Sequence, residues 1–176
     1  MSGIDLYNAT IGLCNHSLHT LLHIIEKAKA HPNAAELASA RLYPDMLPFS
    51  YQVIIVSNFA KKTVERLTTP PEPLPVWEDK ETTFDELVAR INKTLALLAT
   101  VKREDLVPRE QTIRYTGEFE PFQASTEQYV LTYSIPNILF HVATAYDILR
   151  HKGVDVGKAD FLQGYVKDLD VKRKAQ

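Results

Sequence analysis

The sequence predicts an all-α fold, a four-helix bundle with a small β-hairpin inserted before the last long helix. Four long segments repeat apolar residues at the spacing of amphipathic helices, at about 5–30, 44–67, 83–101 and 125–152. A proline-rich stretch at 69–75 interrupts this pattern, and residues 111–123 change to a shorter period. We expect one domain over residues 1–164 and a charged tail over 165–176 that frays.

The first helix is predicted by one apolar stripe and by signals at both ends. Asp5 is expected to cap its N-terminus, because a carboxylate accepts hydrogen bonds from free backbone N–H groups. Pro32 ends it, because proline disfavours helical dihedral angles in the residue before it. A short helix is expected within 33–40. The stripe comprises Ile11, Cys14, Leu18, Leu21, Leu22 and Ile25.

The second and third helices flank the proline-rich stretch. We expect the second helix to begin near Pro44 and the prolines at 70–75 to hold an extended connection, since they lack backbone donors. Thr83 and Glu86 have the capping-box spacing that opens the third helix. The apolar face of the second helix comprises Phe49, Val53, Val56, Phe59, Ala60, Val64 and Leu67.

The hairpin and the last helix follow one another. Ile113-Arg114-Tyr115 and Phe119-Glu120-Pro121-Phe122 are expected to form two strands around a turn at Thr116-Gly117. Ser125 and Gln128 form a second capping-box pattern, which opens a helix to about Lys152, and Gly153 is its expected C-terminal cap.

Composition excludes several classes of function. Lys and Arg number 20 and Asp and Glu 22, a formal net charge of −2, which gives no electrostatic case for nucleic acid or an acidic membrane. Cys14 is the only cysteine, so an internal disulfide and a thiolate metal cage are excluded, and it is expected to be a small buried hydrophobe. No signal peptide and no membrane span are seen, so we expect a cytoplasmic location.

Three polar residues fall on or beside apolar helix faces. Gln52 on the second helix and Asn137 and His141 on the last are expected to meet inside the bundle. Pro136 should free a backbone carbonyl near Thr132 and open space beside Asn137. This pattern favours the wall of a cavity, although hydrogen-bonded core residues would give the same pattern.

A second polar cluster, His16, His19 and His23, lies nearly opposite the apolar stripe of the first helix. The spacing suits a metal, but the face is expected to meet solvent or a partner subunit. This face and the pair Ile54-Ile55 are candidate surfaces of a homodimer. No phosphate-binding glycine loop, nucleophile elbow or HExxH motif is present.

The last helix carries a resemblance. Residues 136–154 (PNILFHVATAYDILRHKGV) resemble the last helix of an uncharacterised domain-of-unknown-function family within the DinB/YfiT-like helical bundle superfamily, and residues 41–48 (RLYPDMLP), Gln52 and residues 157–162 (GKADFL) match the same family pattern. The resemblance implies a four-helix bundle, often dimeric. It also implies, for many members, a divalent metal held by three histidines, and for some a thiol-dependent transferase or isomerase activity.

This chain departs from that histidine set. His141 matches the second histidine of the HxxxH pair on the last helix, whereas Asn137 stands at the first and Gln52 at the position of the second-helix histidine. Because amide oxygens are weak ligands for zinc or nickel, we expect no metal and no other cofactor.

The expected function is a metal-independent isomerase, lyase or cyclase that acts on a largely apolar small molecule. His141 would be the general acid or base, because the ordinary pKa of imidazole suits neutral pH, and Asn137 and Gln52 would orient it or stabilise an oxyanion. A non-catalytic binding or dimerisation module and a metal-dependent DinB-like hydrolase or transferase, with Asp45 near His141, remain the alternatives. The expected substrate contacts are Tyr133, Tyr146, Asp45, Arg41, Phe49 and Trp77.

Overall fold

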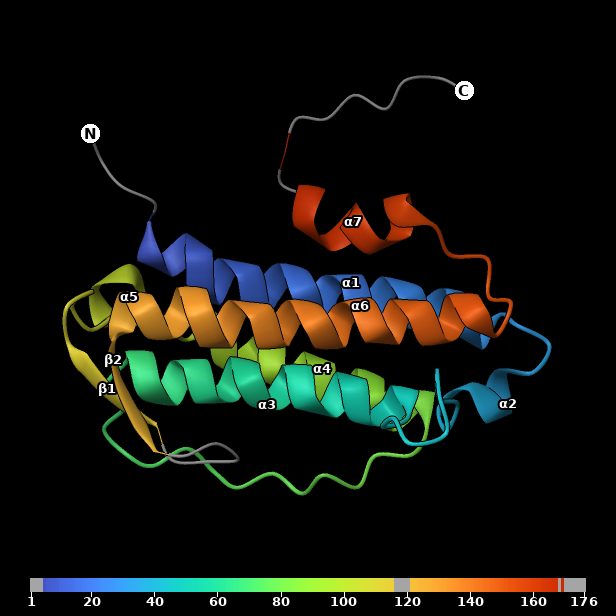
Figure 1. Cartoon of the computed structure of the whole chain (residues 1–176), viewed down its shortest axis with the longest axis horizontal. Coiled ribbons are helices and arrows are strands. Elements are labelled where there is room, and N and C mark those ends of the chain that lie inside the picture. The colour runs from blue at the N-terminus through green and yellow to red at the C-terminus, as the bar shows by residue number, and fades with distance from the viewer. Residues whose placement is uncertain (1–4, 116–120, 168, 170–176) are drawn as a thin grey trace.

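The computed structural model describes residues 5–115, 121–167 and 169. Its main body is a bundle of α1 (Leu13–Lys29), α3 (Phe49–Leu67), α4 (Phe84–Ala99) and α6 (Ile135–His151) (Figure 1). α3 packs on α6 and α4, and α1 packs on α6 and α4 from the other side. The predicted all-α bundle with a small hairpin is confirmed.

The N-terminal segment follows the prediction closely. The Tyr7 N–H donates to the Asp5 carboxylate at 3.2 Å, and the segment η1 (Asn8–Gly12) leads directly into α1. α1 ends before Pro32, and α2 (Ala34–Leu37) is the short helix that follows. Of the predicted stripe, all residues are buried except Leu22, which is half-buried.

The second helix begins later than predicted, at Phe49 rather than near Pro44. Pro48 stands in extended conformation as the N-cap, and proline disfavours helix in the residue that precedes it. Residues 41–48 instead form a loop. The Met46 N–H donates to the Tyr43 carbonyl at 3.0 Å, and the Arg41 guanidinium donates to the Met46 carbonyl.

The proline-rich stretch is an extended strap, residues 68–82, which runs along the outside of α3 and α4 (Figure 1). The predicted capping box opens α4: the Glu86 N–H donates to the Thr83 hydroxyl at 3.3 Å, and the Thr83 N–H donates to the Glu86 carboxylate at 3.0 Å. The short helix η2 (Arg103–Asp105) follows α4.

The hairpin is confirmed as β1 (Thr112–Tyr115) and β2 (Phe122–Ser125). The strands are antiparallel, with Thr112 opposite Ser125 and Tyr115 opposite Phe122. The expected turn at Thr116-Gly117 and the expected strand residues Phe119 and Glu120 lie outside the described residues. The hairpin covers a second apolar cluster at one end of the bundle, which includes Leu67 and Tyr129.

The last helical segment has three parts: α5 (Thr126–Tyr129), the wide-turned η3 (Val130–Ser134) and α6. The Ser125 capping box is present, with the Gln128 N–H donating to the Ser125 hydroxyl at 3.2 Å. The wide turns precede Pro136, which lacks the N–H that a regular helix needs there. Gly153, at a φ of 89°, caps the end of α6 as expected.

The helix α7 (Lys158–Val166) is not among the helices that the sequence pattern predicts. α7 lies along the outside of α1 (Figure 1). A Cβ on Gly164 would lie 2.2 Å from the His16 carbonyl oxygen, so the two backbones meet where no side chain fits. Tyr165 and Val166 belong to this helix, and most of the expected frayed tail, residues 168 and 170–176, lies outside the described residues.

Among the residues that the structure describes, no helix has both the length and the apolar character needed to cross a membrane.

Candidate functional site

His141 and Gln52 meet across the contact between α6 and α3. The His141 Nδ1 atom lies 2.7 Å from the Gln52 Oε1 atom, and the Gln52 Nε2 atom donates to the Leu47 carbonyl at 3.0 Å. Gln52 is buried, so both ends of its amide need these partners. The glutamine therefore joins the 41–48 loop to α6.

These contacts determine which nitrogen of His141 carries the proton. Because the Leu47 carbonyl can only accept, the Gln52 amide must direct its NH₂ group there and its oxygen toward His141. Nδ1 is consequently the protonated nitrogen, and Nε2 bears the lone pair. Within the described residues Nε2 has no hydrogen-bond partner, and it is not buried.

The surroundings of His141 are aromatic. Its ring lies 6.4 Å from the ring of Phe59 and 5.1 Å from that of Phe140, measured between centroids. Burial lowers the pKa of His141 from 6.5 to about 4, because the charged imidazolium loses hydration. The expectation of an ordinary imidazole pKa near neutrality is therefore wrong, and the ring is neutral at pH 7.

Asn137 does not join His141 and Gln52. Its Nδ2 atom donates to the Tyr133 carbonyl at 2.7 Å, one turn earlier in the same helical segment. This carbonyl belongs to the wide-turned segment before Pro136, next to the predicted position near Thr132. The side chain thus satisfies the backbone that the proline disturbs, which is a role inside the helix.

Tyr133, a predicted substrate contact, is linked to His141 through the ring of Phe59. Its ring lies 5.8 Å from Phe59, which itself lies next to His141. The Tyr133 hydroxyl donates to the Tyr115 hydroxyl of β1 at 2.8 Å, and burial raises the pKa of Tyr133 well above its usual range. It remains a neutral phenol at physiological pH.

The other predicted contacts lie elsewhere. Phe49 is fully buried against Phe84, and Tyr146 packs on Phe161 of α7, so neither lies beside His141. Arg41 and Asp45 are exposed on the 41–48 loop, where Arg41 donates to the Met46 carbonyl. Trp77 lies on the strap.

The histidine face of α1 lies against α7 and is partly exposed. His23 Nε2 lies 2.7 Å from the Asp160 carboxylate, and Lys27 lies 3.1 Å from it. Burial opposes ionisation of Asp160, but the hydrogen bonds from His23, the Gly157 N–H and Lys27 outweigh it and lower its pKa to about 2. Ile54, the other candidate dimer residue, is buried, and Ile55 is half-buried.

The residues present do not fit the histidine-bound metal that the resemblance implies. Across residues 5–115, 121–167 and 169, no three His, Cys, Asp or Glu side chains gather where they could hold a metal ion. The Gln52 oxygen is already used by His141. A metal ion bound at Nε2 would have His141 as its one protein ligand among these residues.

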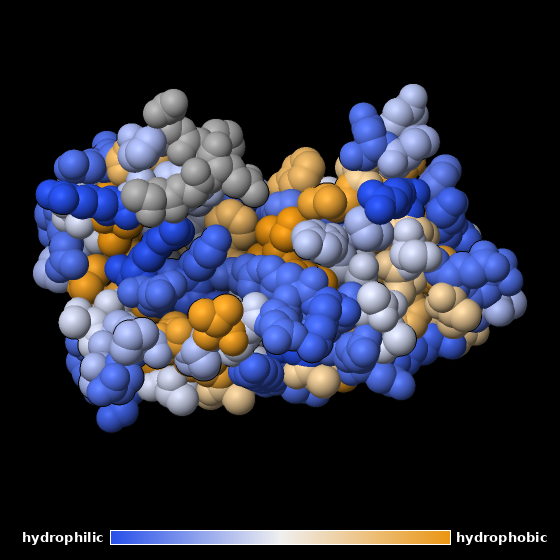
Figure 2. Space-filling model, turned by 90° about the horizontal axis from the view of Figure 1, so that it is seen from below, coloured by the Kyte–Doolittle hydropathy of each residue, from blue (hydrophilic) through white to orange (hydrophobic). Residues whose placement is uncertain are grey.

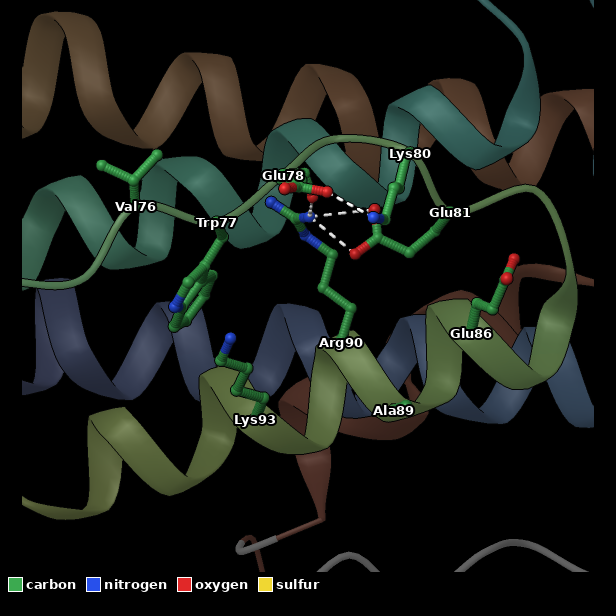
Figure 3. Close-up of a pocket in the computed structure, with 9 residues that line it drawn as sticks. All are labelled: Val76, Trp77, Glu78, Lys80, Glu81, Glu86, Ala89, Arg90 and Lys93. Atoms are coloured by element: carbon green, nitrogen blue, oxygen red, sulfur yellow. Dashed lines mark hydrogen bonds and ion pairs between the residues drawn. The ribbon is translucent and has the colours of Figure 1, made fainter.

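Sequence reasoning missed Arg90, the buried cation of α4. It donates to Glu81 at 2.8 Å and to the Glu78 carbonyl at 2.9 Å, both on the strap (Figure 3). It donates as well to Asp79 of the strap at 2.7 Å. It also donates to side chains of α3. The signal was an arginine on the apolar face of a helix, three residues after Leu87.

Two hollows flank the strap. One, of about 500 Å³, lies between Trp77 and α4, and another, of about 670 Å³, lies beneath the prolines. Figure 2 views this side of the molecule, where hydrophilic residues surround smaller apolar patches. His141 lines neither hollow and lies instead on the α3–α6 side.

Comparison with known proteins places the chain among similar bundles. A family described as "Domain of unknown function (DUF1993)" matches residues 6–162. The crystal structure of a DinB family member protein from Shewanella denitrificans is 34% identical, with a TM-score of 0.80, and the match covers 89% of this chain and 91% of that one. No curated protein matches the chain.

Proposed function

The chain belongs to the family described as Domain of unknown function (DUF1993), with a DinB-like fold, and we propose that it is a metal-independent acid–base enzyme for a small, largely apolar molecule. His141 is the general base. The observation that carries this proposal is the His141–Gln52–Leu47 series of hydrogen bonds, which leaves an accessible lone pair on Nε2.

The site is suited to take a proton from a neutral molecule. A base must hold its lone pair toward the substrate, and the fixed tautomer does this without any rearrangement. The low pKa keeps His141 unprotonated throughout the neutral range. Phe59 and Phe140 supply apolar contacts on which a flat or aliphatic substrate can pack.

The reaction classes that fit are isomerisation, elimination and cyclisation. In an isomerisation, Nε2 removes a proton from an activated carbon and the imidazolium returns it to another. In an elimination, the electron pair of the C–H bond forms a new π bond and a leaving group departs. Gln52 accepts the Nδ1 hydrogen bond throughout and is the positioning residue for the base.

The alternative functions differ in what they require of the surface around His141. A non-catalytic ligand-binding or dimerisation module is favoured by Phe140, which is 58% exposed beside His141. A metal-dependent DinB-like hydrolase or transferase is disfavoured because the described residues contain no group of three His, Cys, Asp or Glu side chains that could hold a metal ion. The proposal includes a cytoplasmic location, which the single, buried Cys14 supports.

The test uses 5-nitrobenzisoxazole, a neutral, flat probe of bases in apolar surroundings. A base removes its ring C–H proton, the electron pair forms a nitrile, and the N–O bond breaks to give a coloured phenolate. We expect saturable elimination by the wild-type protein and a loss of about a hundredfold in His141→Gln. The exposed His151 on the same helix provides the control, His151→Gln, which should retain the wild-type rate.

The pH profile adds a second criterion. The rate should stay level from neutrality down to about pH 5 and fall as His141 is protonated near pH 4. A rate that depends on a group titrating near 6.5, or no His141-dependent rate at all, would overturn the assignment of His141 as the base.

A further inference from the structure

The hollow beside Trp77 is a separate site on the other flank of α3. It lies between the strap and the α4 residues Ala89, Arg90 and Lys93 (Figure 3), and its volume of about 500 Å³ suits a small molecule. His141 lies on α6, where it meets Gln52 of α3, and does not line this hollow. Ligand binding in the hollow is therefore independent of the proposed enzyme activity.

The carboxylates around this hollow already have hydrogen-bond donors. Glu81 and Asp79 accept from Arg90 at 2.8 and 2.7 Å. Glu86 accepts from the Thr82 and Thr83 N–H groups at 2.8 and 3.0 Å. Glu78 pairs with Lys80. The acidic side chains are therefore engaged within the strap and the start of α4.

Among the residues described, two lysines beside Trp77 have no such partners: Lys93 lines the hollow, and Lys61 contacts the same indole from α3. The Lys93 Nζ atom lies 4.6 Å from the centroid of the Trp77 indole, and the Lys61 Nζ atom lies 5.6 Å from it. Neither ammonium group has a carboxylate partner among the described side chains. Their contact is the indole ring, so two uncompensated cations from α3 and α4 gather at one aromatic side chain.

The indole itself has an unused donor. In the part of the chain that the structure describes, Trp77 Nε1 is the single buried side-chain nitrogen or oxygen without a hydrogen-bond partner. A buried N–H without an acceptor is unfavourable, and native structures keep few of them. The Trp77 N–H and the two lysine ammonium groups are all hydrogen-bond donors. An anion that accepts hydrogen bonds would pair with all three.

We propose that this hollow binds a small aromatic carboxylate. The carboxylate pairs with Lys93 at the edge of the hollow and accepts from the Trp77 N–H once the flexible lysine chain moves aside, which charge-assisted hydrogen bonds favour. Lys61, which contacts the same indole, adds a second positive charge. The ring of the ligand packs on Trp77, Val76 and Ala89.

The chain offers a direct reporter, because Trp77 is its only tryptophan. The proton–nitrogen NMR spectrum therefore contains one indole N–H signal. We would titrate the protein with benzoate and with benzyl alcohol, which has the same ring but no charge, at constant ionic strength. A saturable downfield shift of the indole proton is expected with benzoate, and affinity for benzyl alcohol should be at least about tenfold lower.

Substitution of each lysine tests whether its positive charge contributes to benzoate binding. Lys93→Met and Lys61→Met should each weaken benzoate binding about tenfold. Lys62→Met, at an exposed neighbouring position of α3, is the matched control and should bind like wild type. Far-UV circular dichroism checks that each variant is folded. The absence of a saturable shift at millimolar benzoate, equal binding of benzyl alcohol, or unchanged binding in both lysine variants would each overturn the proposal.

Discussion

Replacing His141 by glutamine should make the stability of the protein less sensitive to acid. Burial holds the pKa of His141 at about 4 in the native state, whereas the unfolded chain titrates near 6.5. Between these values the unfolded state binds a proton that the native state does not. The free energy of unfolding therefore rises with pH across this window. The contribution of His141 to it is fully present above pH 6.5 and is lost as the pH falls to about 4.

The size of the effect follows from the two pKa values. The gap between 6.5 and about 4 corresponds to about 3 kcal/mol at about 1.4 kcal/mol per pKa unit. His141 is only half-buried, and solvent screens it, so we expect about 1–2 kcal/mol of pH-dependent stability from this residue. Glutamine cannot titrate and removes this contribution.

Urea unfolding at pH 7, at pH 5.5 and near pH 4 measures the effect, because the linear extrapolation gives the free energy at each pH. The loss of the contact with Gln52 lowers the free energy of unfolding of His141→Gln by the same amount at every pH. The two proteins are therefore compared by the slope of their unfolding free energy against pH. His151→Gln, at the exposed end of α6, should keep the wild-type slope. Equal slopes for His141→Gln and wild type would refute the lowered pKa of His141 in the native state.

Three further substitutions or reagents test the packing. Gly164→Ala forces a Cβ to within 2.2 Å of the His16 carbonyl, so α7 should separate from α1 and be cut early in limited proteolysis; wild-type resistance would contradict this contact. Arg90→Met leaves the strap carboxylates unpaired and should cost about 3 kcal/mol in urea unfolding, and a cost below about 1 kcal/mol would show that the network is dispensable. Burial raises the pKa of Cys14 to about 12, so iodoacetamide at pH 8 should label it only as fast as the protein unfolds, and rapid labelling of the native state would disprove its burial.

The helices of the bundle could be predicted because each carries its own local signals. The Thr83 and Ser125 capping boxes and the Gly153 cap are short-range patterns whose geometry depends on neighbouring residues alone. The predicted start of α3 is wrong because the restriction that Pro48 places on the preceding residue outweighs the apolar spacing there. α7 was missed because its weakly apolar sequence depends on α1 for its packing partner.

The candidate site was only partly predictable. The pairing of Gln52 with His141 follows from two polar residues on facing apolar stripes. Helical angles could not tell that Asn137 would turn back to its own helix, since the wide turns before Pro136 alter the local geometry. The partners of Arg90 lie on the strap, whose extended path has no periodicity from which to predict contacts.

The contact between α7 and α1 also bears on synthesis of the chain. α1 leaves the ribosome long before α7, yet the Thr20 hydroxyl donates to the Phe161 carbonyl and the Ser17 hydroxyl bonds the Tyr165 hydroxyl, about 140 residues later. Both side chains are fully buried in the finished protein. Until α7 emerges, this polar flank of α1 stays hydrated, so this layer of the native fold forms only after residues 158–166 have been synthesised. A ribosome stalled before Lys158 should hold a bundle that lacks this final layer.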